Sequence, residues 1–151
     1  MTIEEALSIT DEMKPNMMRR NLKLKYLTEI EQLIWHEIIC KHYSNDYTPP
    51  APYNPETDPL NVGWGQLPIQ TPEPDEAPEY DEESDQGTEL LIPDPYSMVY
   101  VYWLMSKVDI QNQEDARYNI DRAHFETAYK TMSDWYTRKH MPVQRTREIR
   151  I

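Results

Sequence analysis

Apolar residues recur with helical spacing along four stretches of this chain. They predict helices near residues 3–13, 17–43, 95–111 and 113–140. Thr2 and Glu5 have the spacing of a capping box at the start of the first stretch. In the second stretch, one broad face carries the apolar residues Tyr26, Leu27, Ile30, Leu33, Ile34 and Ile38. The predicted fold class is therefore all-α, a small bundle of about four helices.

The third stretch differs because its apolar residues occupy two helical faces. One face is formed by Tyr96, Val99, Tyr100, Trp103, Leu104 and Ile110, and the other by Val101, Met105 and Val108. A helix of this kind is usually buried on two sides. We expect that Tyr100, Trp103, Leu104 and Met105 cannot all face one small bundle, so that part of this surface contacts another subunit or partner. The competing interpretation is a buried strand through residues 98–105, because Val and Tyr favour strands.

A Pro-rich acidic insert, residues 45–92, separates the second and third stretches. Residues 47–92 hold eleven acidic residues, no Lys or Arg, and nine of the thirteen prolines. Prolines remove backbone donors and like charges resist compaction, so we expect no core here. Residues 62–69 could form a short β-hairpin with residues 88–92. Tyr53 and Trp64 offer aromatic anchors for a protein partner.

Charge divides the chain into three parts that we expect to form one domain. The helical core comprises residues 1–44 and 93–142, followed by a basic C-terminal arm, residues 143–151. The net charge is −12, and residues 47–92 account for −11 of it. The arm carries Arg145, Arg147 and Arg150, and we expect it to dock on a neighbouring protein through charge-assisted bonds. The anionic chain repels nucleic acid at long range, which argues against a DNA-binding protein.

No motif in the sequence indicates catalysis, and we expect no enzyme activity, cofactor or metal. The segment His36–His42 departs from the zinc-protease spacing, which needs the second histidine on the same helix face. Asp81, Glu83 and Asp85 resemble a calcium loop but lack the glutamate that closes such a loop. Cys40 is the single cysteine, so an intrachain disulfide is impossible. No apolar run is long enough to span a bilayer, and we expect no membrane partner.

The last block carries a family resemblance. It begins with LLIPDPYSMVYVYWLM and ends with WYTRKHMP, and it resembles the C-terminal half of the head–tail adaptor (connector) proteins of tailed bacteriophages and prophages. The matching residues are Leu90, Leu91, Pro93, Pro95, Tyr96, Tyr100, Tyr118, Asn119, Trp135, Tyr136, His140, Met141 and Pro142. The opening ALSITDEMKPN and the long helix after it are also similar. The resemblance covers residues 3–43 and 88–142 and leaves most of the acidic insert outside.

The resemblance implies a structural virion protein, a connector subunit in a ring below the portal and around the DNA channel. Such a ring usually has about twelve copies. The implied partners are the portal protein and the next connector or tail protein, with DNA only as passing, non-specific cargo. The implied location is the head–tail interface of the virion, after assembly in the host cytoplasm. The family motif carries no catalytic residues.

A connector of this kind gives the acidic insert a place in the assembly. We expect its acidic part to face solvent or the lumen of the ring, where negative charge lets DNA slide without sticking. The residues concerned are Asp75, Glu76, Asp81, Glu82 and Glu83.

Three alternatives remain open. An acidic inhibitor that mimics DNA and blocks a host nuclease would hold its carboxylates on rigid elements, whereas most of those in this chain lie in the Pro-rich insert. A non-structural tail-assembly chaperone would come from the same phage setting without entering the virion. An enzyme is a third class, for which the sequence offers no site.

Overall fold

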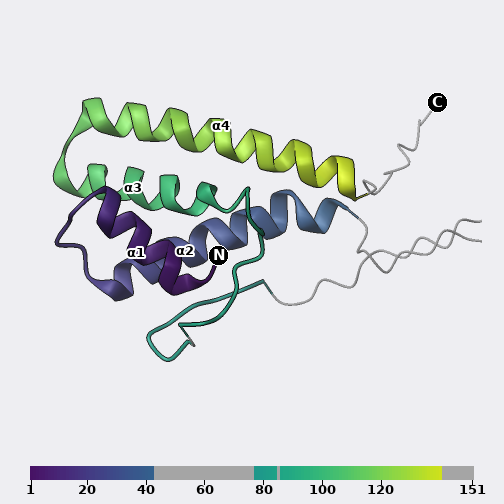
Figure 1. Ribbon diagram of the computed structural model, residues 1–151, viewed down its shortest axis with the longest axis horizontal. Helices are drawn as coiled ribbons and strands as arrows, with labels where there is room; N and C mark the ends of the chain where they lie inside the picture. The colour runs from purple at the N-terminus through teal and green to yellow at the C-terminus, as the bar shows by residue number, and fades with distance from the viewer. Residues whose placement is uncertain (43–76, 85, 141–151) are drawn as a thin grey trace, which may run out of the picture.

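The computed structural model describes residues 1–42, 77–84 and 86–140, and all regular elements in these ranges are helical (Figure 1). The helices are α1 (Ile3–Met13), α2 (Arg20–Glu37), α3 (Met98–Asn112) and α4 (Asp115–Lys139), and a short 3₁₀ turn, η1 (Ile39–Lys41), follows α2. The predicted all-α bundle is confirmed over these residues. The strand interpretation of residues 98–105 is wrong, because they belong to α3.

Helix α1 begins where the sequence predicts. The Thr2 backbone N–H donates to Glu5 Oε2 at 2.8 Å, and the Glu5 N–H donates to Thr2 Oγ1 at 3.3 Å. This reciprocal pair satisfies two donors that would otherwise be left free at the helix start. The capping box therefore sets the start of α1 at Ile3.

Helix α3 is the centre of the bundle, with α4 along one side and α1 and α2 on the other (Figure 1). Nine of its fifteen residues are buried. Burial on two sides is therefore confirmed. Ile110 is an exception to its predicted face, because it lies near the end of α3 and is 54% exposed. Gln113 has a left-handed backbone with φ of 58°, which ends α3 and turns the chain into α4.

Part of the predicted insert packs on the core. Ile3 N donates to Thr88 O and Leu90 N donates to Met1 O, each at 3.1 Å, so residues 88–90 run antiparallel to the chain start. Leu90 and Ile92 are buried, and the Tyr100 hydroxyl accepts a hydrogen bond from Ile92 N at 3.0 Å. The predicted insert boundary at residue 92 is therefore wrong, because these apolar side chains complete the core beside α3. The proposed hairpin partner, residues 62–69, lies outside the described residues.

The insert and the arm begin at the same place on the bundle. The His42 ring lies 5.3 Å from the Tyr136 ring, edge to face, and the His140 ring stacks on Tyr136 at 3.9 Å. Residues 43–76 follow His42 and residues 141–151 follow His140. Tyr136 thus joins the two points from which these segments leave the core.

Candidate functional site

The four residues of α3 that the sequence proposed as an interface lie inside the chain's own core. Tyr100 is 0% exposed, Trp103 7%, Leu104 1% and Met105 8%. The expectation that one small bundle cannot cover them all is wrong, because α1, α2 and α4 surround α3. These side chains stabilise the bundle, and they are not available to a partner.

Trp103 connects three helices. Its Nε1–H donates to Tyr26 O of α2 at 3.0 Å, and its ring lies 4.9 Å from that of Phe125 of α4. Lys107 Nζ sits 4.2 Å from the centre of the Trp103 ring and 5.0 Å from that of Tyr26. The ring is therefore covered by a cation on its outer side, which lets a largely apolar side chain sit at the edge of the core.

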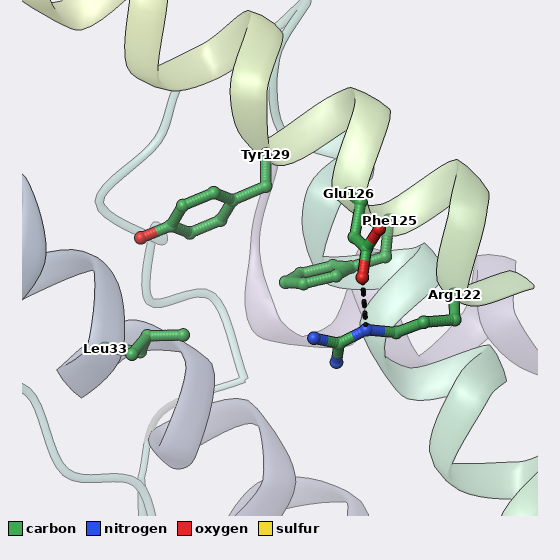
Figure 2. A pocket seen from close by; sticks show the side chains of 5 residues that line it. All are labelled: Leu33, Arg122, Phe125, Glu126 and Tyr129. Carbon is green, nitrogen blue, oxygen red and sulfur yellow. Dashed lines mark hydrogen bonds and ion pairs between the residues drawn. The ribbon is translucent and has the colours of Figure 1, made fainter.

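A hollow opens beside this contact, between α2 and α4 (Figure 2). Its volume is about 310 Å³, and its lining residues are Leu33, Arg122, Phe125, Glu126 and Tyr129. Leu33 is 39% exposed and the Tyr129 side chain points from α4 toward it. Arg122 Nε donates to Glu126 Oε1 at 3.1 Å, so the one cation in the lining is paired with its own carboxylate. The lining of the hollow is therefore mainly apolar and contains one internal ion pair.

The acidic residues of the insert that the structure describes are exposed. Asp81, Glu82 and Glu83 lie on a turn, where Asp81 Oδ1 accepts hydrogen bonds from Glu83 N and Ser84 Oγ at 3.0 Å each. Tyr80, which precedes this turn, is half-buried. The remaining proposed site residues lie outside the described residues, namely Tyr53, Trp64, Asp75, Glu76, Arg145, Arg147 and Arg150.

Tyr80 anchors the segment through a buried acid that sequence reasoning missed. The Glu31 side chain of α2 is fully buried and accepts hydrogen bonds from Tyr80 Oη at 3.0 Å and Leu91 N at 3.2 Å. The Tyr100 hydroxyl also contacts this carboxylate. Burial raises the pKa of Glu31, although the three hydrogen bonds oppose the rise. A signal existed in the sequence, because Glu31 stands on the apolar side of its helix, between Leu27 and Ile34.

A second buried polar cluster joins α1, α3 and α4. Lys14 Nζ forms ion pairs with both Asp109 and Asp121, and Asp109 is fully buried. Asp109 Oδ2 receives no hydrogen bond from the described residues. Burial raises the pKa of Asp109, Lys14 lowers it, and the neighbouring Asp121 adds to the rise. Burial lowers the pKa of Lys14, but its two carboxylate partners outweigh that effect and the pKa is raised.

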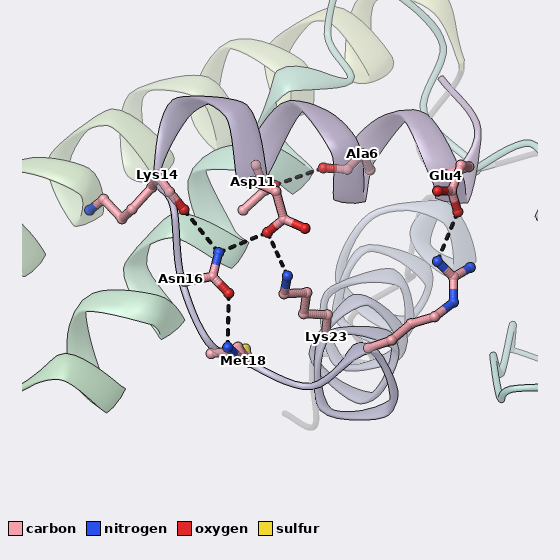
Figure 3. Close-up of polar contacts among 9 residues, drawn as sticks. Glu4, Ala6, Asp11, Lys14, Asn16, Met18 and Lys23 are labelled. Atoms are coloured by element: carbon pink, nitrogen blue, oxygen red, sulfur yellow. Dashed lines mark hydrogen bonds and ion pairs between the residues drawn. The ribbon is translucent and has the colours of Figure 1, made fainter.

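The loop after Lys14 closes with its own polar contacts (Figure 3). Asn16 does not cap the second helix, because its side-chain oxygen accepts a hydrogen bond from Met18 N at 3.0 Å, whereas α2 begins only at Arg20. Its Nδ2 donates to Asp11 Oδ1 at 2.8 Å, and Lys23 forms an ion pair with the same carboxylate. These contacts fix the end of α1 against the start of α2.

The described ranges contain neither a cluster of metal ligands nor a membrane-spanning helix. Over residues 1–42, 77–84 and 86–140, no group of three or more His, Cys, Asp or Glu side chains could hold a metal ion. His36 is exposed, and Cys40 is half-buried with a pKa that burial raises. None of the helices in these ranges is long and apolar enough to cross a bilayer.

Comparisons with family models, with curated proteins and with solved structures find no match for this chain.

Proposed function

We propose that this chain is a head–tail connector subunit, a structural virion protein that forms a ring below the portal of a tailed phage. The proposal begins from the sequence resemblance and from the polarity of the bundle. His42 and His140 contact one side chain, Tyr136, so the acidic insert and the basic arm leave from one end. The other end of α4 carries the cluster around Lys14.

This polarity is the observation that carries the proposal. A subunit whose insert and arm leave from one end, with a different surface at the other end, can contact neighbours in one direction repeatedly, which is how head-to-tail rings are built. The opposite charges of the insert and the arm also favour contacts between copies or with other components.

The roles of the family-matching residues are consistent with a shared fold. Tyr96 stacks on Trp135 at 4.7 Å and links the start of α3 to the end of α4. Tyr100 binds the backbone of Ile92, and His140 stacks on Tyr136. Residues of the motif therefore hold helix ends together.

Virion composition tests the proposal. Mass spectrometry of purified, tailed particles from the phage or prophage that encodes this chain should detect it in a copy number close to that of the portal protein. Deletion of its gene should give DNA-filled heads that lack tails. Absence from the particles would refute the connector role and favour a nuclease inhibitor or an assembly chaperone, which act outside the virion.

A further inference from the structure

Exposed apolar side chains gather at one end of the bundle. The described residues include five large apolar side chains that are exposed, and four of them are Met13, Met17, Ile110 and Ile120, at 51%, 97%, 54% and 58%. Met13, Ile110 and Ile120 each stand beside a member of the cluster formed by Lys14, Asp109 and Asp121. In Figure 1 the end of α1, the loop after it and the turn from α3 to α4 lie at this same end.

This end is also acidic. We define the acidic end as residues 11–17 and 109–121, which contain six acidic and two basic residues, for a net charge of −4. Lys23 from α2 offsets one of these charges through Asp11. The exposed carboxylates include Glu12 and Asp115. Beneath the surface, Asp109 Oδ2 is buried without a donor from the described part of the chain. A fitting partner is therefore basic and carries apolar side chains.

The chain itself contains such a segment at residues 141–151, MPVQRTREIRI, which includes the arm. Residues 143–151 carry three arginines against one acid, for a net charge of +2. They also carry three branched aliphatic side chains, Val143, Ile149 and Ile151. The arginines match the carboxylates and the aliphatic side chains match the exposed isoleucines and methionines.

Arg145 and Arg147 of the arm cannot reach the acidic end of their own copy. From Ile120 to His140 the helix spans about 30 Å, at roughly 1.5 Å per residue. Arg145 and Arg147, five and seven residues past His140, reach at most about 18 and 25 Å in extended chain. Only the last residues of the arm, from Ile149 on, could return to the acidic end of the same molecule. A contact that uses Arg145 and Arg147 therefore forms between copies.

We propose that the arm of one copy docks on the acidic end of the next, so that copies associate head to tail. A contact of this kind joins two different surfaces and closes into a ring when its rotation allows. It names the partner of the arm, and it rests on the ring of copies in the proposed function. The acidic insert is the competing partner, because it leaves the bundle beside the arm, but in the described ranges it lacks the exposed large apolar side chains of the acidic end.

A peptide titration tests the contact. A fluorescent peptide of residues 141–151 is titrated with the full chain, and its anisotropy reports binding. We expect saturable binding that weakens as salt rises. The double variant Glu12→Lys and Asp115→Lys should weaken peptide binding at least tenfold. The double variant Ile110→Ser and Ile120→Ser, which leaves the charge unchanged, should weaken binding several-fold. All four positions are exposed, and circular dichroism checks that the variants fold.

The matched control is Glu82→Lys and Glu83→Lys. It makes the same change in net charge at exposed positions of the insert, so long-range attraction is altered equally in both double variants. Binding should stay within about twofold, because the proposed contact does not use these two carboxylates. Three results would overturn the proposal: no binding of the peptide, equal weakening by both charge variants, or weakening by the insert variant alone, which would assign the arm to the insert.

The outcome is separable from that of the virion test. The titration needs no phage component, so absence of the chain from virions would refute the connector role and leave a measured head-to-tail contact standing. Failure of the peptide to bind would refute this contact while leaving the virion result unaffected.

Discussion

Replacing Lys14 with methionine should reduce the folding stability of this protein more than any change to an exposed ion pair does. The substitution keeps most of the side-chain volume and removes the charge that two buried carboxylates share. The side chains are 14% exposed for Lys14, 0% for Asp109 and 10% for Asp121, so water cannot replace the ammonium. The perturbation therefore isolates the charge that holds α1 against α3 and α4.

The burial of these groups sets the magnitude. Removing one partner of a buried ion pair costs about 3–5 kcal/mol, because the remaining charge is left uncompensated. The core is near 100 residues, for which 1 kcal/mol lowers the melting temperature by about 4 °C. Lys14→Met should thus lower it by about 12–20 °C near neutral pH. Lys41→Met removes an exposed pair with Glu37 and should cost no more than about 0.5 kcal/mol.

The sign of the pH dependence gives a second check. Burial raises the folded-state pKa of Asp109 and Lys14 lowers it, so removing Lys14 raises that pKa further. Stability is then fully present below the unfolded pKa and is lost as pH rises through the folded pKa. The loss relative to wild type should therefore shrink from pH 8 to pH 5.5, a range above the isoelectric point of about 4.7.

Thermal unfolding followed by circular dichroism at these two pH values is the assay. Adding Asp109→Asn to Lys14→Met should recover part of the lost stability, because it removes one of the two uncompensated charges. A melting temperature within about 3 °C of wild type at pH 8, or a loss that does not shrink in acid, would refute the reasoning about this cluster.

Three further predictions follow from other contacts. Trp103→Ala should cost about 3–5 kcal/mol, measured by urea unfolding, because it opens a cavity between three helices; a change below 1 kcal/mol would contradict that role. The folded-state pKa of Glu31 is raised, so the stability advantage of wild type over Glu31→Gln should fall as pH rises from 5.5 to 8. An advantage that grows over this range would contradict the raised pKa. Five carboxylates of the insert can be changed to lysine together, namely Asp75, Glu76, Asp81, Glu82 and Glu83. If the insert faces the lumen of the proposed ring, this change should slow DNA packaging or ejection in assembled particles, and unchanged DNA transit would exclude a lumenal insert.

The helices follow from the sequence because their signals are local. The capping box at Thr2 and Glu5 places the start of α1 at the predicted residue. The two apolar faces of α3 predict its central position. Boundaries are less local: α2 starts later than predicted because Asn16 satisfies Met18 N within the loop, so the loop replaces the first predicted turn.

The polar clusters depend on contacts that no local pattern contains. Lys14 and Asp121 are 107 residues apart in the chain, and Glu31 and Tyr80 are 49 apart. Asp121 does interrupt the apolar stripe of α4, and the interruption signals a buried partner without naming it. The surplus of apolar residues on α3 predicts a contact with another subunit or partner. The prediction fails because no local pattern shows how many helices of the same chain surround α3.

The proposed connector role is tested most directly with the portal protein of the phage or prophage that encodes this chain. Native mass spectrometry of the purified portal ring, mixed with excess chain, resolves each added subunit of 18.1 kDa. The proposed function predicts a dominant complex in which the number of bound chains equals the number of portal subunits. A portal ring whose mass stays unchanged at saturating concentrations of the chain would contradict it.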